Sequence, residues 1–410
     1  MSTFDCSYFL GDWQGFEVEK VLRVDAVSGI RPQVWIRLRP QRGDIPLCSV
    51  CGQMVPHVHE YVERRIRDLP IFEFKVLLFV KIRRIACSTC GKVIERIPWL
   101  ERYSRHTKRL AASVASMCKF ATIKDTAEYY DLDRKTVKAI DKEYLIEHLP
   151  TMDLSGLEII AMDEFAIEKG HQYATVVIDP RRKQVLWIGR GRTRESVHPF
   201  FELLGEENCR KIKAVAMDMN ASFEQEVWEH CPNAKIVYDL FHVVAKYGRE
   251  VIDRVRVDEA NRLRNDKKAR QVVKGSRWLL LKNQENLTRE KDRIRLKELL
   301  EANKQLALVY VLKADLKQLW QFTNPWDARR FWKEWLAKAY DSEIRPLILF
   351  AKRLKPYIAG VISHCKYRLH TSILEGINNK IKVIKRRAYG YRDDEYFFLK
   401  IKQAFPGNWT

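Results

Sequence analysis

The chain contains 410 residues, of which 46% are hydrophobic and 31% are charged, a balance that excludes a disordered or fibrous protein. Because a single hydrophobic core seldom extends over so long a chain, we expect two or more domains. The 74 lysines and arginines outnumber the 53 acidic residues and give a net charge of +21, which indicates a polyanionic partner, with nucleic acid the first candidate.

The sequence also predicts a cytoplasmic protein with no membrane partner. No apolar run approaches the roughly 18 residues of a transmembrane helix, and the opening residues MSTFDCSYFL lack the pattern of a secretory signal. Four of the nine cysteines form two close pairs and the rest are scattered, which favours a metal site plus buried thiols in a reducing compartment. The scattered cysteines are Cys6, Cys118, Cys209, Cys231 and Cys365.

Within residues 1–102, the segment CSVCG at 48–52 returns as CSTCG at 87–91. Two cysteines at this spacing bind one side of a tetrahedral zinc ion, and the glycine after them permits the positive φ of a tight knuckle. We therefore predict one structural zinc ion, with four reduced cysteines and no metal as the alternative. The predicted ligands are Cys48, Cys51, Cys87 and Cys90.

Between the two cysteine pairs, alternate residues are apolar, which predicts one face of a β-strand in a hairpin. These residues are Phe72, Phe74, Val76, Leu78, Val80 and Ile82. With four thiolates available for zinc, His57 and His59 are predicted to be surface residues and not further ligands. Residues 1–102 are thus predicted to form a zinc-ribbon-like β domain.

Residues 103–150 show the periodicity of short helices, with Leu110, Val114 and Met117 on one stripe. Helices at 123–130 and 134–145, joined by a turn, fit a helix-turn-helix, and Asp133 is expected to cap the second helix. That helix begins with basic residues where a recognition helix contacts DNA, although a plain helical linker has a similar pattern. The predicted DNA contacts are Arg134, Lys135 and Lys138, and the predicted interior residues are Ala127, Leu132, Val137 and Ile140.

A polar linker at 150–156 precedes a segment of strands and helices that extends to residue 239. Strands are predicted at 157–163, 172–179, 184–188, 212–217 and 235–238, and helices at 194–204 and 221–230. This order, β-β-β-α-β-α-β, predicts a mixed sheet with helices on its faces. The fold class is therefore a multidomain α+β and α/β protein.

Residues 240–370 have a helical, highly charged pattern and are predicted to form an all-helical insertion. Its tryptophans are expected mostly to pack between helices, with a few free to stack on bases. They are Trp278, Trp320, Trp326, Trp332 and Trp335.

The last segment, 371–410, is predicted to begin with an amphipathic helix near Ser372. Its apolar stripe comprises Ile373, Ile377, Ile381 and Ile384, and its polar face comprises Glu375, Asn379, Lys382 and Arg386.

Three acidic residues lie where the predicted fold would bring them together: Asp163 and Asp218 at the ends of strands, and Glu375 on the final helix. Hard divalent cations prefer carboxylate oxygens, and two such ions can hold the attacking and the leaving oxygen of an in-line phosphoryl transfer. Each acid taken alone could instead cap a turn or a helix.

The segments around these acids resemble the DDE transposases of bacterial insertion sequences, specifically their ISL-three branch. They are AMDE at 161–164, AMDM at 216–219, and EGINNKIK at 375–382, which leads into RRAYGYR at 386–392. The resemblance spans nearly the whole chain and has the same order of parts, namely a zinc-knuckle domain, a helix-turn-helix and an RNase H-like core interrupted by a helical insertion.

The resemblance implies that Asp163, Asp218 and Glu375 are the catalytic triad and hold two Mg²⁺ or Mn²⁺ ions. Glu164 is the rival for the first position, but it faces the other side of its strand. The resemblance further implies that the protein binds the terminal inverted repeats of its element through the zinc and helix-turn-helix modules, cuts the DNA at the element ends and joins the 3′-hydroxyl to target DNA. The expected assembly is a homodimer or larger on double-stranded DNA, in the bacterial cytoplasm at the nucleoid.

Asp239 and His242 match a DxxH signature of related transposases. We weigh an auxiliary catalytic role for His242 against a simple helix cap by Asp239 that His242 contacts.

After Glu375, a basic run with interleaved tyrosines favours a surface that binds the phosphates of the scissile strand. The run comprises Lys380, Lys382, Lys385, Arg386, Arg387 and Arg392, with Tyr389 and Tyr391.

Two other functions remain open at this point. One is an RNase H-like nuclease that hydrolyses DNA without strand transfer, and the other is a zinc-dependent DNA-binding regulator whose core is inactive.

Overall fold

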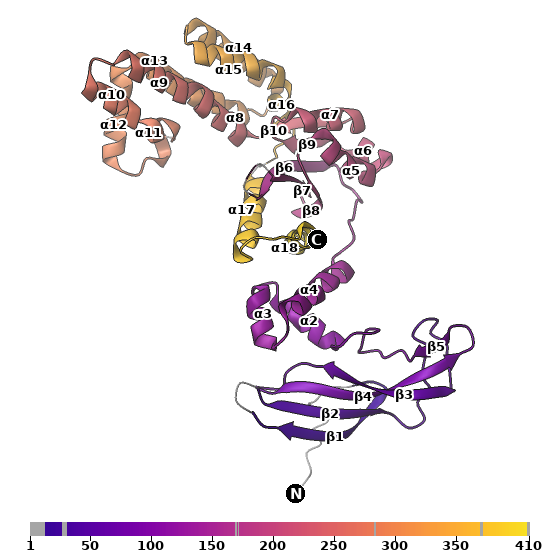
Figure 1. The fold of residues 1–410 in the computed structure, drawn as a ribbon. Coiled ribbons are helices and arrows are strands. Elements are labelled where there is room, and N and C mark those ends of the chain that lie inside the picture. Colours follow the sequence, from indigo (N-terminus) through magenta and orange to yellow (C-terminus); the bar gives the residue numbers. More distant parts are fainter. Residues whose placement is uncertain are drawn as a thin grey trace. The chain divides into compact units, whose positions relative to one another are not determined.

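A computed structural model describes residues 13–26, 31–168, 170, 172–282, 284–369 and 372–407. The chain divides into two compact units, Met1–Leu149 with Lys385–Lys400, and Pro150–Ile384 with Ile401–Thr410 (Figure 1). Among the described helices, none combines the length and the apolar character needed to cross a bilayer. The predicted mixture of β, helix-turn-helix, mixed-sheet and all-helical parts is confirmed.

The first unit begins with a five-stranded sheet in the order β1-β2-β4-β3, to which β5 adds by pairing with β4. The strands are β1 Phe16–Val24, β2 Gln33–Pro40, β3 Val58–Arg67, β4 Lys75–Cys87 and β5 Gly91–Ile94. As predicted, β3 and β4 form an antiparallel hairpin between the cysteine pairs, and alternate residues of β4 from Val76 to Ile82 are buried. β1 and β2 were not predicted.

The predicted apolar face was wrong at Phe72, which is 91% exposed. The backbone groups of Ile71 and Phe74 bond to each other and close a tight turn, in which Phe72 has a φ of 52°. The alternation therefore starts only with β4, because a turn interrupts the two-residue period of a strand. Phe74, beside this turn, is only half-buried.

The helix-turn-helix is confirmed as α3 Ile123–Tyr130 and α4 Arg134–His148, preceded by α2 Lys108–Met117. The side chain of Asp133 accepts a hydrogen bond from the backbone N–H of Lys135, the predicted cap. The interior residues are Ala127, Val137 and Ile140, which are buried, and Leu132, which is half-buried. Asp68 attaches this bundle to the sheet, because its buried carboxylate accepts hydrogen bonds from Trp13, Thr107 and Arg109.

A final helix, α18 Asp394–Ala404, was not predicted, and its residues up to Lys400 belong to the first unit. Tyr396 and Lys400 donate hydrogen bonds over 2.5 and 3.0 Å to the same oxygen of Asp141, which lies on α4. All three side chains are buried. The helix-turn-helix is therefore packed against a segment that lies some 250 residues away along the chain.

The second unit contains a mixed five-stranded sheet in the order β10-β9-β6-β7-β8. Its strands are β6 Ile159–Glu168, β7 Gln172–Asp179, β8 Gln184–Arg190, β9 Ala214–Met217 and β10 Lys235–Tyr238. The first three strands are antiparallel to one another, whereas β9 pairs in parallel with β6 and β10 in parallel with β9. This is the mixed sheet that the element order predicted, and it fits the RNase H-like core that the family resemblance implied.

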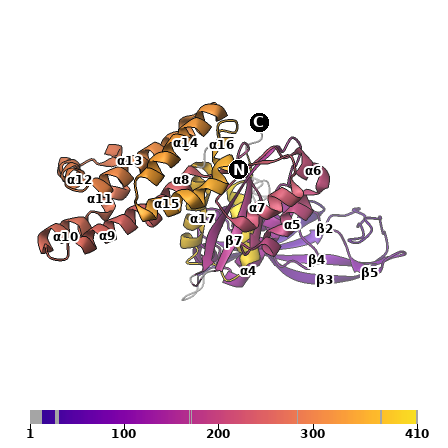
Figure 2. The ribbon, with the colours of Figure 1, turned by 90° about the horizontal axis from the view of Figure 1, so that it is seen from above.

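Three helices pack on one face of this sheet: α5 Arg194–Leu204, α6 Glu206–Lys211, which was not predicted, and α7 Ala221–His230 (Figures 1 and 2). Ile160 and Met162 of β6 share their core. Because side chains alternate along a strand, Asp163 faces the opposite side. There it contacts Asn378 of the helix α17 Ser372–Arg387.

The described residues between 240 and 369 contain no strand, as predicted, and form a set of packed helices (Figure 2). The helices are α8 Leu240–Tyr247, α9 Asp253–Arg262, α10 Lys267–Gly275, α11 Arg277–Leu281, α12 Glu290–Ala302, α13 Lys304–Gln318, α14 Pro325–Asp341, α15 Arg345–Leu354 and α16 Ile358–Ser363. A π-helical turn, Gly248–Ile252, joins α8 to α9. Trp320, Trp332 and Trp335 are buried between helices, whereas Trp278 and Trp326 are exposed.

Candidate active site and zinc site

The four cysteines of the two knuckles converge in the first unit. Their sulfur atoms all lie within 4.8 Å of one another, and the Sγ atoms of Cys51 and Cys87 are 3.7 Å apart. Both knuckle glycines have the predicted positive φ, 73° at Gly52 and 75° at Gly91. Four thiolates at these separations suit a tetrahedral structural zinc ion. His57 and His59 are exposed, as predicted.

Backbone N–H groups near the cysteine site lower the pKa of the Cys48 thiol. The pKa of Cys48 is lowered to about 6, mainly because the backbone N–H groups of Cys51 and Val50 donate to its sulfur. A thiolate is the form that binds zinc, so this knuckle holds one ligand in the reactive state before metal arrives. The other described cysteines, Cys118, Cys209, Cys231 and Cys365, are buried free thiols, and Cys6 lies outside the described residues.

Asp163 and Asp218 occupy matching positions in the second unit. Ala161 of β6 is paired with Ala216 of the parallel strand β9, and each aspartate follows two residues later. Neighbouring strands are about 4.8 Å apart, so the register places the two carboxylates side by side at one edge of the sheet. The sequence predicted these two acids side by side, but it was wrong to end the first strand at Asp163, because β6 continues to Glu168 and pairs with β7 beyond that point.

Asp163 is held by two hydrogen bonds and is only 7% exposed. The backbone N–H of Glu164 donates to its Oδ1 over 2.8 Å, and Nδ2 of Asn378 donates to its Oδ2 over 2.5 Å. Burial raises the pKa of Asp163 to about 6, and the hydrogen bonds and nearby His242 oppose that rise. The carboxylate is therefore held in a fixed orientation, and a cation beside it would offset the cost of burying its charge.

Asp218 is paired with His242, which lies on α8. His242 Nδ1 is 3.0 Å from Asp218 Oδ2, and its Nε2 is 3.8 Å from Asp239 Oδ2. The hydrogen bond to Asp218 raises the pKa of His242 to about 9, so the imidazole is protonated at neutral pH. Burial acts to raise the pKa of Asp218, but His242 reverses this and holds it below its ordinary value.

The structure shows the helix cap by Asp239 and the contacts of His242, whereas an auxiliary catalytic role for His242 stays a prediction. Asp239 caps α8, since its Oδ1 accepts a hydrogen bond from the N–H of Phe241 over 2.7 Å. His242, however, is closer to Asp218 than to Asp239, so it also belongs to the acidic pair.

Glu375 is exposed and lies one helical turn before Asn378 on α17. Because residues three apart share a helix face, the contact between Asn378 and Asp163 directs that face toward the aspartates. Within the described residues, three or more potential ligands come within 4.8 Å of one another at two places, and the three acids are not one of them.

The residues present fit divalent metal ions. Asp163 and Asp218 contribute fixed carboxylate oxygens, Glu375 adds a solvent-accessible one, and oxygen ligands with open positions are what Mg²⁺ and Mn²⁺ prefer. Glu164, the rival for the first position, lies on the opposite side of β6, where Arg192 donates to it over 3.1 Å. Sequence reasoning missed Asn378, although its position three residues after Glu375 could have indicated it.

The predicted DNA contacts on α4 have two environments. Arg134 and Lys135 are exposed, whereas Lys138 is 2.9 Å from Asp393 and packs over the ring of Tyr396. In the basic run, Lys380, Lys382, Arg386 and Arg392 are exposed, and Lys385 and Arg387 are half-buried.

A cleft of about 620 Å³ lies between the start of α3, the start of α4 and the segment 388–393, all within the first unit. Its lining includes Arg134, Lys135, Tyr389 and Arg392. Tyr389 is 94% exposed. The structure therefore joins two sets of residues that the sequence analysis had placed on separate domains.

Three family models match the chain. Residues 160–401 match a family described as "Transposase", residues 45–90 match the "zinc-finger of transposase IS204/IS1001/IS1096/IS1165", and residues 95–145 match the "Helix-turn-helix domain of transposase family ISL3". The zinc-finger match covers all four converging cysteines and ends at the last of them, Cys90.

Whole-length relatives agree with these matches. The chain is 52% identical over 400 residues to the transposase for insertion sequence element IS1001 of Bordetella parapertussis, with 97% of each chain covered. It is 25% identical over 398 residues to the transposase for insertion sequence element IS1557 of Mycobacterium tuberculosis, covering 90% of this chain and 88% of that one. The chain therefore belongs to the ISL3 family of insertion-sequence transposases, with a zinc finger and a DNA-binding helix-turn-helix.

Proposed function

We propose that this protein cuts DNA at the ends of its own insertion sequence and joins the exposed 3′-hydroxyl to target DNA, with Asp163, Asp218 and Glu375 as the catalytic acids. The observation that carries this proposal is the register of two neighbouring parallel strands, which sets Asp163, within β6, beside Asp218, directly after β9. The contact of Asn378 with Asp163 brings the helix of Glu375 to the same edge.

Asp163, Asp218 and Glu375 would hold two Mg²⁺ or Mn²⁺ ions, which when bound activate the attacking oxygen and stabilise the leaving one. Asn378 fixes the orientation of the Asp163 carboxylate, and the N–H groups of Glu164 and Met219 fix one oxygen of Asp163 and of Asp218. His242 supplies a positive charge beside Asp218 and acts as an auxiliary residue. Water and then a DNA hydroxyl are the nucleophiles, so no covalent enzyme intermediate is required.

The cleft beside α4 is proposed to receive the element end. The side chains of Arg134, Lys135 and Arg392 are exposed around it and can contact phosphates, while the exposed ring of Tyr389 can stack on a base. Lys138 is paired with Asp393 in this structure and would need to exchange that partner for a phosphate. Two ends must be cut together, which favours a homodimer or larger assembly on DNA.

The test uses precut element ends, target DNA and Mg²⁺ with the full-length protein. We expect strand-transfer products from the native chain, and none from Asp163→Asn, which should still bind element ends. Hydrolysis without joining would favour a plain nuclease, and end binding without any cleavage by the native chain would favour a DNA-binding regulator. Cleavage by Asp163→Asn at the native rate would contradict the assignment of the acids.

A further inference from the structure

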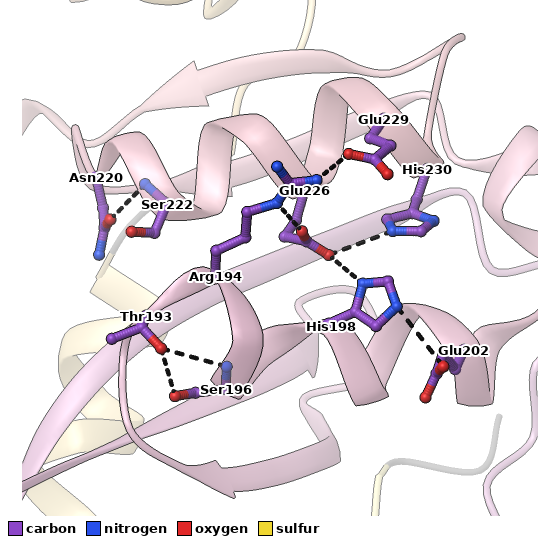
Figure 3. A network of polar contacts seen from close by, with 10 residues as sticks. All are labelled: Thr193, Arg194, Ser196, His198, Glu202, Asn220, Ser222, Glu226, Glu229 and His230. Carbon is purple, nitrogen blue, oxygen red and sulfur yellow. Dashed lines mark hydrogen bonds and ion pairs between the residues drawn. The ribbon is translucent and has the colours of Figure 1, made fainter.

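A second cluster of potential metal ligands lies in the RNase H-like core, on helices α5 and α7 (Figure 3). His198 Nδ1 is 2.9 Å from Glu226 Oε2, and His230 Nε2 is 3.3 Å from the same oxygen. Ligand atoms of the three residues all lie within 4.8 Å of one another. We infer that His198, Glu226 and His230 form a binding site for a divalent transition metal, with zinc the best fit.

The donor set points to this class of ion. Imidazole nitrogens suit zinc and its neighbours in the first transition row, whereas magnesium and calcium prefer oxygen ligands alone. Two histidines and one carboxylate leave a coordination position that a water molecule can fill. Glu226 and His230 are four residues apart on α7, so they share one helix face, and His198 faces them from α5.

The carboxylate at the centre is fully buried, with 0% of Glu226 exposed. Its other oxygen, Oε1, accepts a hydrogen bond from Arg194 Nε over 2.6 Å, so Oε2 is the oxygen directed toward both histidines. His230 Nε2 is itself buried and makes no hydrogen bond to a described residue. Its 3.3 Å contact with Glu226 Oε2 lacks hydrogen-bond geometry, so the hydrogen-bonding capacity of this nitrogen is not met, and coordination of a metal ion would satisfy it.

Groups around the three ligands have the arrangement that supports metal sites. Arg194 fixes the carboxylate, and Glu202 Oε1 lies 3.6 Å from the other ring nitrogen of His198, Nε2 (Figure 3). A metal-ligating histidine commonly has its second nitrogen directed at a carboxylate, which sets the tautomer and the ring orientation. The ring of His230 stacks on Phe201 with the centroids 5.2 Å apart, which restricts its rotation.

This site differs from both sites described above. It contains no cysteine, and α5 and α7 cover the sheet face of Ile160 and Met162, whereas Asp163 faces the other side. A metal ion here would join α5 to α7, and α7 begins three residues after Asp218. The expected effect is therefore on the stability of this part of the core, independent of whether the chain cuts DNA.

The experiment measures bound metal in the full-length Asp163→Asn protein, so that the carboxylate site contributes less to the count. After removal of metal and dialysis against Zn²⁺, we expect two ions per chain, one at the cysteines and one at the new site. Glu226→Gln should reduce the count to one. Glu229→Gln, which removes a neighbouring negative charge on the same helix but none of the three ligands, should retain two.

Cobalt distinguishes the two sites by their spectra. Thiolate ligands give charge-transfer bands, which a site of histidine and carboxylate lacks, so Cys87→Ser should bind one Co²⁺ ion with weak d–d bands only. Those bands should disappear when Glu226→Gln is added. If Glu226→Gln does not fold, His230→Phe, which retains the stacking on Phe201, replaces it. A count of one ion in the parent protein would show that the three residues form only a closed hydrogen-bonded network, and would overturn the inference. Two ions after Glu226→Gln or His230→Phe would show that the second ion binds elsewhere, which would overturn it equally.

Discussion

Asn378 donates a hydrogen bond from Nδ2 to Oδ2 of Asp163 over 2.5 Å. The two residues are 215 positions apart, and their contact joins the helix of Glu375 to the strand of Asp163. This hydrogen bond occupies one of the two oxygens of the Asp163 carboxylate, which is buried. The amide side chain thereby sets both the angle of the carboxylate and the position of the helix.

Replacing Asn378 by alanine is expected to lower the rate of DNA cleavage by roughly 10- to 100-fold, the usual effect of losing a group that orients a metal ligand. Binding of element ends should remain unchanged, because the contact lies in the RNase H-like core. The cleavage rate is measured with labelled element ends at saturating Mg²⁺. The affinity for element ends is measured separately by a gel-shift titration. Asn379→Ala, at the exposed neighbouring position, is the control and should cleave normally. Equal rates of DNA cleavage for Asn378→Ala and Asn379→Ala would show that Asn378 does not contribute to the active site.

Changing Cys87 to serine is expected to release the zinc ion of the cysteine site, since three thiolates hold zinc much less firmly than four. Loss of metal should also weaken end binding, because the knuckles form one end of the first unit. The metal content is measured by elemental analysis after dialysis. His57→Ala removes an exposed histidine near the knuckles and should leave the zinc in place. Full zinc retention by Cys87→Ser would refute the four-cysteine assignment.

Removing the carboxylate of Asp141 should destabilise the first unit by about 3–5 kcal/mol, the cost of leaving a buried charge without its partner. Lys400 is 4% exposed and donates a hydrogen bond to Asp141. Asp141→Ala would therefore leave the ammonium group of Lys400 buried without its acidic partner. Urea unfolding followed by tryptophan fluorescence measures the effect. Adding Lys400→Met should recover much of the loss, because no unpaired charge then remains. Glu147→Ala, an exposed change on the same helix, should have little effect.

Arg134→Ala is expected to weaken binding of element ends and to lower the slope of log affinity against log salt by about one, as for one lost phosphate contact. Arg134 is exposed at the start of α4 and lines the cleft. Lys119→Ala removes one exposed positive charge outside that cleft and serves as the control. An identical salt slope for the native chain and Arg134→Ala would exclude this contact.

The stability of the first unit should fall as the pH drops below 6.5. His106 is half-buried, and this burial lowers its pKa, so the folded state binds this proton less readily than the unfolded state. Stability from this group is therefore complete above the unfolded pKa of about 6.5 and is lost as the pH falls toward the lower folded value. Thermal unfolding between pH 7.5 and about 5 measures the change. His106→Gln should flatten this dependence, whereas the exposed His59→Gln should not.

Much of the fold could be predicted because its signals are local. The two CxxCG segments, the cap at Asp133 and the alternation of apolar residues in β4 each depend on neighbours within a few positions. The order of strands and helices then placed Asp163 beside Asp218, since β6 and β9 are parallel neighbours in register, although β6 extends to Glu168. The predicted fold singled out Glu375 as the third acid, and the family resemblance implied its catalytic role, which stays a prediction. The turn at Phe72 was missed because the same alternation continues through it in the sequence.

Only the tertiary structure showed the contacts between distant segments. Asn378 meets Asp163, α18 packs on α4, Lys138 pairs with Asp393, and His198 meets Glu226 and His230. These pairs depend on strand register, on helix rotation and on which faces are buried together, and none of them is encoded in a local spacing. The sequence alone thus determined the modules and the kinds of chemistry that they carry. Tertiary packing decided which side chains from distant segments contact each other, because the burial of a side chain and the pairing of its charge arise only when the whole chain has folded.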